Sequence, residues 1–271
     1  MDCDPIMFTV DLEADWGGSA THAVREVLPP FLQLLDRYQV TATFFVVADL
    51  IPYMRHAIAA DGPHEVGSHG LTHTLLTRLD RAGIVFEVAE SKRLLEAAGY
   101  RVSGFRAPYF RSPPMLPHLL TQAGYAYDAS DGSVYPRLPR HRNTVRPRSI
   151  ETPLPQVSTS TLRDGWTPFS LTYLRLYHPF GLPLVSPNAS MFYCHLHEFL
   201  DSTSGWQRLP APLRRLHQRN SGRVAWDILD ELLSRFGHRF VSCHNYLTAQ
   251  YLGQEEEIWP STSSLEPDPQ D

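Results

Sequence analysis

Residues 6–16 read IMFTVDLEADW, an apolar run followed by three acidic residues at alternate positions. The apolar, largely β-branched and aromatic start of this stretch predicts a short buried strand. Asp11, Glu13 and Asp15 occupy alternate positions, and alternate residues of an extended segment point to the same side. The stretch therefore predicts carboxylates at the carboxyl end of a strand, where α/β folds place their active sites. An exposed acidic turn is the competing interpretation.

Working outward from this strand, the first half of the chain alternates between two hydrophobic patterns. Strand-like runs occupy 6–10, 40–47, 64–68 and 102–106, and helical spacing occupies 24–38, 81–98 and 114–123. This β-α-β-α order predicts α/β architecture with a parallel sheet or a barrel.

The second half is less regular. Residues 131–190, which include a run at 169–177, are expected to form loops and irregular strands within the same domain. Further predicted elements are a strand at 191–195, a helix at 223–236 and a last strand at 239–243. The acidic, Pro- and Ser-rich residues 253–271 predict a disordered tail. We therefore expect a domain over 1–252 and a tail over 253–271.

Composition excludes several classes of protein. The chain has 271 residues, 42% of them hydrophobic, which suffices for one large domain. Its net charge of −5 argues against a nucleic-acid partner. Three widely spaced cysteines do not indicate disulfides. The sequence shows neither a membrane span nor a signal peptide, so we expect a cytoplasmic protein, with a peripheral position at the membrane face as an option.

Basic residues are almost all arginine, with Lys92 as the single lysine. Five arginines fall within residues 137–148. Such a cluster can bind phosphate, but a solvated loop in an arginine-rich chain is the preferred interpretation.

A second motif, HEVGSHGLTH at 64–73, contains His69 and His73. Two histidines four residues apart lie on one face of a helical turn and can bind one metal ion. Together with an upstream carboxylate they predict a site with open positions for Zn²⁺, Co²⁺, Fe²⁺ or Ni²⁺. Two unrelated surface histidines are the alternative.

Two further motifs follow predicted strands. GFRAPYFR at 104–111 places Arg106 where its guanidinium can orient a carboxylate. FYCHLHEF at 192–199 places His195 where it can act as a general acid. A thiol nucleophile formed by Cys194 and His195 is disfavoured, because adjacent strand residues face opposite sides.

In their order and spacing these motifs resemble the polysaccharide deacetylase superfamily, the NodB-homology domain of carbohydrate esterase family four. ATFFV at 42–46 also matches its second strand. Within it, the chain resembles a subgroup whose first motif is Asp-Val-Glu-Asp-Trp and whose late motif is Tyr-x-His-Pro-Trp-Glu. Here Ala14 is inserted before Asp15, and His197 stands where Trp is usual. The resemblance covers residue 6 to about 250 and implies an irregular (β/α) barrel of about seven strands.

The resemblance also implies residue roles. Asp11 would be the general base for the attacking water, and Arg106 would hold it. Glu13, His69 and His73 would bind a divalent metal, zinc above all, with Asp15 competing with Glu13.

On the leaving-group side, His195 would protonate the departing amine, with His197 as the alternative. The backbone N–H of Tyr109 would stabilise the oxyanion.

The implied function is metal-dependent N-deacetylation of an amino sugar, in a glycan or in a lipid-linked precursor. Three alternatives stay open: a deformylase or other amide hydrolase on the same site, a metal-free member, and a non-catalytic glycan-binding relative.

Overall fold

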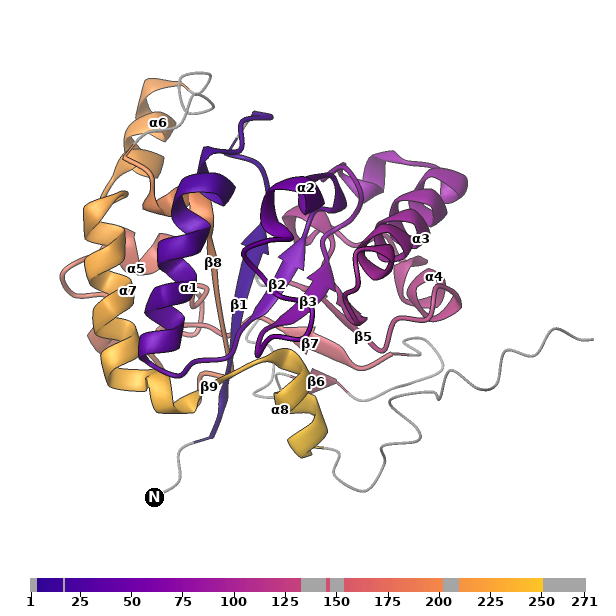
Figure 1. Cartoon of the computed structure of the whole chain (residues 1–271). Coiled ribbons are helices and arrows are strands. Elements are labelled where there is room, and N and C mark those ends of the chain that lie inside the picture. The colour runs from indigo at the N-terminus through magenta and orange to yellow at the C-terminus, as the bar shows by residue number, and fades with distance from the viewer. Residues whose placement is uncertain (1–3, 17, 133–144, 147–153, 202–209, 251–271) are drawn as a thin grey trace, which may run out of the picture.

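The computed structural model describes residues 4–16, 18–132, 145–146, 154–201 and 210–250 (Figure 1). In these ranges one sheet contains nine strands: β1 (Ile6–Leu12), β2 (Thr43–Val46), β3 (Glu65–Ser68), β4 (Val102–Phe105), β5 (Tyr127–Asp131), β6 (Val145–Arg146), β7 (Gln156–Ser158), β8 (Met191–His195) and β9 (Phe240–Val241).

The strand order is β6-β7-β5-β4-β3-β2-β1-β8, with β9 also paired to β1. Seven strands, from β7 through β5, β4, β3, β2 and β1 to β8, run parallel, and β6 pairs antiparallel with β7. They form a nearly closed barrel, which confirms the predicted irregular (β/α) barrel of about seven strands.

Helices surround this barrel: α1 (Leu28–Arg37), α2 (Ile51–Met54), α3 (Arg81–Ala97), α4 (Leu116–Gln122), α5 (Leu171–Tyr177), α6 (Ala211–Gln218), α7 (Arg223–Phe236) and α8 (Cys243–Gln250). Figure 1 shows α1 and α7 together on one flank and α3 and α4 together on the other. The helical spacing of α1 and α7 predicted that each is a helix with an apolar face to bury, but not which helices lie together.

Two predicted elements are corrected by the structure. The run at 169–177 was expected among loops and irregular strands, but residues 171–177 form α5. The last strand was predicted over 239–243, yet β9 ends at Val241 and α8 begins at Cys243. Short runs rich in apolar and β-branched residues do not distinguish strand from helix, which explains both errors. The arginine-rich stretch, apart from 145–146, and the tail over 253–271 lie outside the described residues.

Alternation along β1 divides the core into two layers. Ile6, Phe8 and Val10 pack with the main core outside the barrel, whereas Met7 belongs to a separate cluster with Phe45 of β2. Such alternation follows from the two-residue period of a strand.

The inner cluster also includes Cys243, Tyr246 and Leu247 of α8. In Figure 1 this helix lies at the end of the barrel where β1 begins. One end of the barrel interior is therefore filled by α8, and the opposite end, where the parallel strands finish, remains for a site.

Candidate active site

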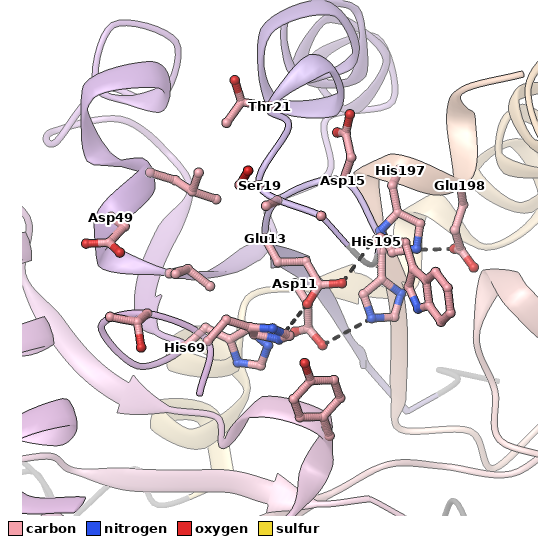
Figure 2. A pocket seen from close by; sticks show the side chains of 18 of the residues that line it. Asp11, Glu13, Asp15, Ser19, Thr21, Asp49, His69, His195, His197 and Glu198 are labelled. Atoms are coloured by element: carbon pink, nitrogen blue, oxygen red, sulfur yellow. Dashed lines mark hydrogen bonds and ion pairs between the residues drawn. The ribbon is translucent and has the colours of Figure 1, made fainter. Parts of the chain in front are cut away.

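A cavity of about 960 Å³ lies at the carboxyl ends of the parallel strands. Figure 2 shows Asp11, Glu13, His69, His195 and His197 pointing toward one another within it. Asp11 is on β1, His195 ends β8, and the others stand on the segments that directly follow strands. Segments far apart in the sequence thus converge because parallel strands deliver their ends to one place.

Glu13, His69 and His73 form a cluster suited to a metal ion. One ligand atom from each lies within 4.8 Å of the other two. Glu13 Oε2 is 2.6 Å from Nε2 of His73. That nitrogen is buried, yet no hydrogen bond of acceptable alignment reaches it from the described residues. Two imidazoles and a carboxylate are a donor set that Zn²⁺ and neighbouring divalent ions accept, so these residues fit a metal ion.

The orientation of His69 supports the same assignment. Its Nδ1 is 2.8 Å from the carbonyl oxygen of Arg106, which can only accept a hydrogen bond. The proton therefore sits on Nδ1, and the lone pair of Nε2 remains available. This outer hydrogen bond is the usual way in which proteins fix the tautomer of a metal-binding histidine. Burial also lowers the pKa of His69 to about 4, which keeps the ring neutral.

The two histidines come together through a loop, and the predicted helical turn is wrong. Strand β3 ends at Ser68, and no helix forms between it and Leu76. Gly70 and His73 both have positive φ, at 83° and 60°, which a right-handed helix does not allow. The ring centroids of His69 and His73 nevertheless lie 5.0 Å apart.

Asp15, the alternative to Glu13 as a metal ligand, faces the segment that begins at His22. Its carboxylate accepts hydrogen bonds from the backbone N–H groups of Ala23, at 2.9 Å, and His22, at 3.3 Å. It thereby stabilises the start of the helical turn at Ala23–Val27. The metal-type cluster contains Glu13 and not Asp15.

Arg106 holds Asp11 inside the barrel. Its Nη1 is 2.6 Å from Asp11 Oδ1 and donates to Thr9 Oγ1, while Nε donates to the carbonyl oxygen of Ala129. The guanidinium also lies over the ring of Phe45, at 4.2 Å from its centroid. Side-chain exposure is 0% for Arg106 and 2% for Asp11. Burial alone would raise the pKa of Asp11, but the charges beside it, above all Arg106, hold that pKa below its usual value.

Two more histidines lie on the β8 side. His195 Nε2 is 3.7 Å from Asp11 Oδ2, and His197 Nδ1 is 3.5 Å from Glu13 Oε1. Their rings stack with centroids 5.0 Å apart. The side chain of His195 is 21% exposed and that of His197 is 8% exposed. Burial lowers the pKa of His197 to about 3, so this ring is neutral.

A buried ion pair behind these histidines was missed by sequence reasoning. Arg175 of α5 lies 3.2 Å from Glu198, and both side chains are under 5% exposed. Glu198 also accepts hydrogen bonds from Thr172 and from the backbone N–H of His195. The pair therefore fixes the end of β8. No local motif marks Arg175, because its partner is 23 residues away on another element.

Two residues that the sequence analysis discussed remain: Tyr109, expected at the oxyanion, and Cys194, disfavoured as a nucleophile. Tyr109 adopts a φ of 60° after β4, and its half-exposed ring lies 4.7 Å from that of His73. Cys194 is fully buried among outer core residues, and burial raises the pKa of its thiol well above the ordinary range. A buried, protonated thiol is a poor nucleophile, which agrees with the prediction against a Cys-His pair.

The geometry can be compared with known proteins. Residues 2–127 match the polysaccharide deacetylase family. A chitooligosaccharide deacetylase of Bradyrhizobium sp. (strain ANU 289) is 34% identical over 86 residues, which are 30% of this chain and 39% of that protein. The chain thus aligns with well under half of that relative's length.

Solved structures share the fold. The Bc1960 peptidoglycan N-acetylglucosamine deacetylase superposes with a TM-score of 0.52 at 19% identity, covering 89% of this chain and 87% of that one. Peptidoglycan deacetylase PdaC from Bacillus subtilis superposes with a TM-score of 0.55 at 15% identity, covering 95% and 96%. Likeness at this identity shows the fold alone.

Among the helices in the described ranges, none has the length and apolarity to cross a membrane. The match over residues 2–127 includes the motifs at 6–16, 64–73 and 104–111. Over residues 2–127, nearly half of its length, the chain is similar to the polysaccharide deacetylase family.

Proposed function

We propose that the protein is a metal-dependent hydrolase that removes the N-acetyl group of an amino sugar, in a glycan or in a glycan precursor. The observation that carries this proposal is the meeting of two groups in one cavity: the Glu13, His69 and His73 cluster, and the buried Asp11–Arg106 pair. The family match and the names of the relatives support the substrate class.

The metal would be held by Glu13, His69 and His73. When bound there, a divalent ion supplies Lewis acidity toward the acyl oxygen and a lowered pKa for water. We propose zinc, because the set of two imidazoles and one carboxylate is a common catalytic zinc set; cobalt, nickel and iron(II) are the other candidates.

Asp11 would act as the general base. The Arg106 guanidinium engages Oδ1 and leaves Oδ2 toward the cavity side, 3.7 Å from His195. Because its pKa is held below the usual value, Asp11 is ionised at neutral pH and can accept the proton of the attacking water. Arg106 would position this carboxylate without touching the substrate.

His195 would donate a proton to the departing amine nitrogen. It is more exposed to the cavity than His197, and Asp11 lies beside its Nε2. The backbone N–H of Tyr109, in the turn after β4, would stabilise the oxyanion that develops on the acyl group.

Acetate release tests the proposal directly. The purified, zinc-loaded protein would be incubated with N-acetylglucosamine oligomers and with a lipid-linked N-acetyl sugar, and acetate and formate would be assayed together. We expect acetate; formate alone would assign the protein as a deformylase. Asp11→Asn should bind metal but lose turnover, and the absence of both products with every substrate would refute the proposal.

Metal analysis provides the second test. Elemental analysis of protein purified without chelator should show one zinc ion per chain, and the His69→Ala/His73→Ala double variant should show none. Stoichiometric metal in that double variant would refute the assignment of the ligands.

Two further expectations, on the domain bounds and on the cellular location, accompany this proposal. We propose that residues 1–252 form the catalytic domain, which limited proteolysis would leave intact after loss of 253–271. We also propose a cytoplasmic location, at the membrane face if the substrate is lipid-linked. Fractionation of the native host tests it.

A further inference from the structure

The carboxylate of Glu13 lies between two imidazole rings, one at each oxygen. Oε2 is 2.6 Å from His73 Nε2, and Oε1 is 3.5 Å from His197 Nδ1. His73 belongs to the metal-type cluster, whereas His197 does not. The two oxygens therefore have different surroundings, and His197 faces the oxygen that does not contact His73.

His197 is a buried polar residue whose Nδ1 has a charged neighbour but no hydrogen bond within the described part of the chain. Its side chain is 8% exposed, and Nδ1 has no hydrogen bond among the described residues. Leaving a buried donor or acceptor without a hydrogen bond destabilises the folded state, so such an atom calls for an explanation. Glu13 Oε1 lies 3.5 Å from Nδ1. As an ionised carboxylate oxygen it can only accept a hydrogen bond, so Nδ1 would be the donor. A small adjustment of the Glu13 side chain closes the remaining distance to that of a hydrogen bond.

Glu13 has particular need of such a restraint. A glutamate side chain has three rotatable bonds, and fixing them costs conformational entropy. It also follows β1, which ends at Leu12, so the sheet no longer holds its backbone. The stacked ring of His195, with its centroid 5.0 Å away, keeps the His197 ring in the required plane.

We propose that His197 is a positioning residue for the metal site: its Nδ1–H donates to Glu13 Oε1 and thereby leaves Oε2 as the single ligand oxygen. This inference rests on the proposed metal site, which it deepens by assigning what orients the carboxylate. A hydrogen bond to the second oxygen of a ligating carboxylate fixes its direction before the ion arrives. Loss of such outer contacts typically weakens metal binding 10–100-fold.

Metal affinity measured by competition with a chromophoric chelator tests the proposal, with zinc and cobalt as the probes. His197→Phe keeps a ring that can stack on His195 but removes both nitrogens, and should weaken binding 10–100-fold. His197→Asn places an amide N–H near the position of Nδ1 and should restore most of the affinity. His197→Gln places its amide nearer the position of Nε2 and should not.

His217→Phe is the matched control, because His217 lines the same cavity but contacts the ring of Trp16, at 4.8 Å. Its metal affinity should equal that of the wild type. The visible spectrum of the cobalt form gives a second readout, which should change in the Phe and Gln variants and not in the Asn variant.

The outcomes separate two failures. If the wild type binds neither zinc nor cobalt, the proposed function fails and this inference falls with it. If the wild type binds and His197→Phe binds equally well, only the inference is overturned. Should His197→Phe not fold, as judged by circular dichroism in chelator, equal affinities of the Asn and Gln variants would overturn it.

Discussion

Replacing Arg106 with leucine removes the guanidinium from the barrel interior and leaves Asp11 in place. The substitution eliminates the 2.6 Å ion pair to Asp11 and the hydrogen bonds to Thr9 and to the carbonyl oxygen of Ala129. It also eliminates the contact over the ring of Phe45. Leucine fills part of the same volume, so the main consequence is a carboxylate that is 2% exposed and has lost its counter-ion.

The expected cost in unfolding free energy is large. Breaking a buried ion pair by removing one partner typically costs about 3–5 kcal/mol, because the remaining charge is uncompensated. Total stabilities of single domains are about 5–15 kcal/mol, so this loss is a substantial fraction. Asp11→Asn in the Arg106→Leu background removes the stranded charge. The double variant should therefore be more stable than Arg106→Leu alone, and the two substitutions should be coupled by about 1 kcal/mol or more.

The cost should depend on pH in a defined direction. In the wild type the folded pKa of Asp11 lies below the unfolded value of 3.8, so its contribution is present above pH 3.8 and is lost as the pH falls further. Without Arg106, burial dominates and raises the folded pKa above 3.8. The charged form then destabilises the variant increasingly as the pH rises. The difference between the two proteins should therefore grow from about pH 4 upward.

Urea unfolding followed by circular dichroism at pH 4.5 and 7.5, with chelator present throughout, measures both effects. Arg93→Leu is the control, since Arg93 forms only an exposed ion pair with Glu90, and its unfolding midpoint should stay unchanged. A loss below about 1 kcal/mol for Arg106→Leu at pH 7.5, or a loss that grows as the pH falls, would refute the reasoning about this pair.

Three other outcomes are expected. Glu13→Gln should bind zinc far more weakly than the wild type, whereas Asp15→Asn should retain stoichiometric zinc by elemental analysis and show only a lower melting temperature; equal zinc loss in both would contradict the ligand assignment. Burial raises the pKa of Asp128 from 3.8 to about 6, so stability is lost as the pH rises above 3.8 and the loss is complete above about pH 6. Asp128→Asn should therefore gain up to about 3 kcal/mol at pH 7.5 and less at pH 4.5 in urea unfolding; a pH-independent effect would exclude this cause. Gly104→Ala places a Cβ 2.1 Å from the Tyr127 ring, so it should lower the unfolding free energy by about 1–3 kcal/mol; an unchanged urea midpoint would mean that the ring moves freely.

Sequence patterns predicted the strands and helices in which the hydrophobic pattern extends over the whole element. The predicted strand at 191–195 and helix at 223–236 coincide with β8 and α7, and the predicted helix at 81–98 is α3 with one residue fewer. Helix α7 buries one face, so its period is expressed directly in the sequence, whereas β8 is buried on both faces and stands out as a short apolar run. Helices α5 and α8 span only 7 and 8 residues, too few turns for a helical period to stand out.

The choice between Glu13 and Asp15 was not available from the sequence. Alternation places both on one side only while the chain stays extended, but β1 ends at Leu12. Beyond that point the chain turns, and Asp15 is drawn to the N–H groups of His22 and Ala23. A backbone interaction that depends on the turn itself therefore decides which carboxylate lies beside His69 and His73.

The position of Asp11, in contrast, follows from the packing of the barrel. Met7 is in the inner cluster, Thr9 donates and accepts hydrogen bonds in the interior, and Asp11 is the third residue of the same inward-facing series. A buried carboxylate at the inner end of this series requires a cation that reaches it from inside the barrel. Arg106 meets that requirement because β4 ends one residue earlier, with the strand directed toward the same opening. The alternation that packs the barrel thus also fixes where the proposed general base can lie, and a shift of one residue in β1 would bury that carboxylate in the outer core.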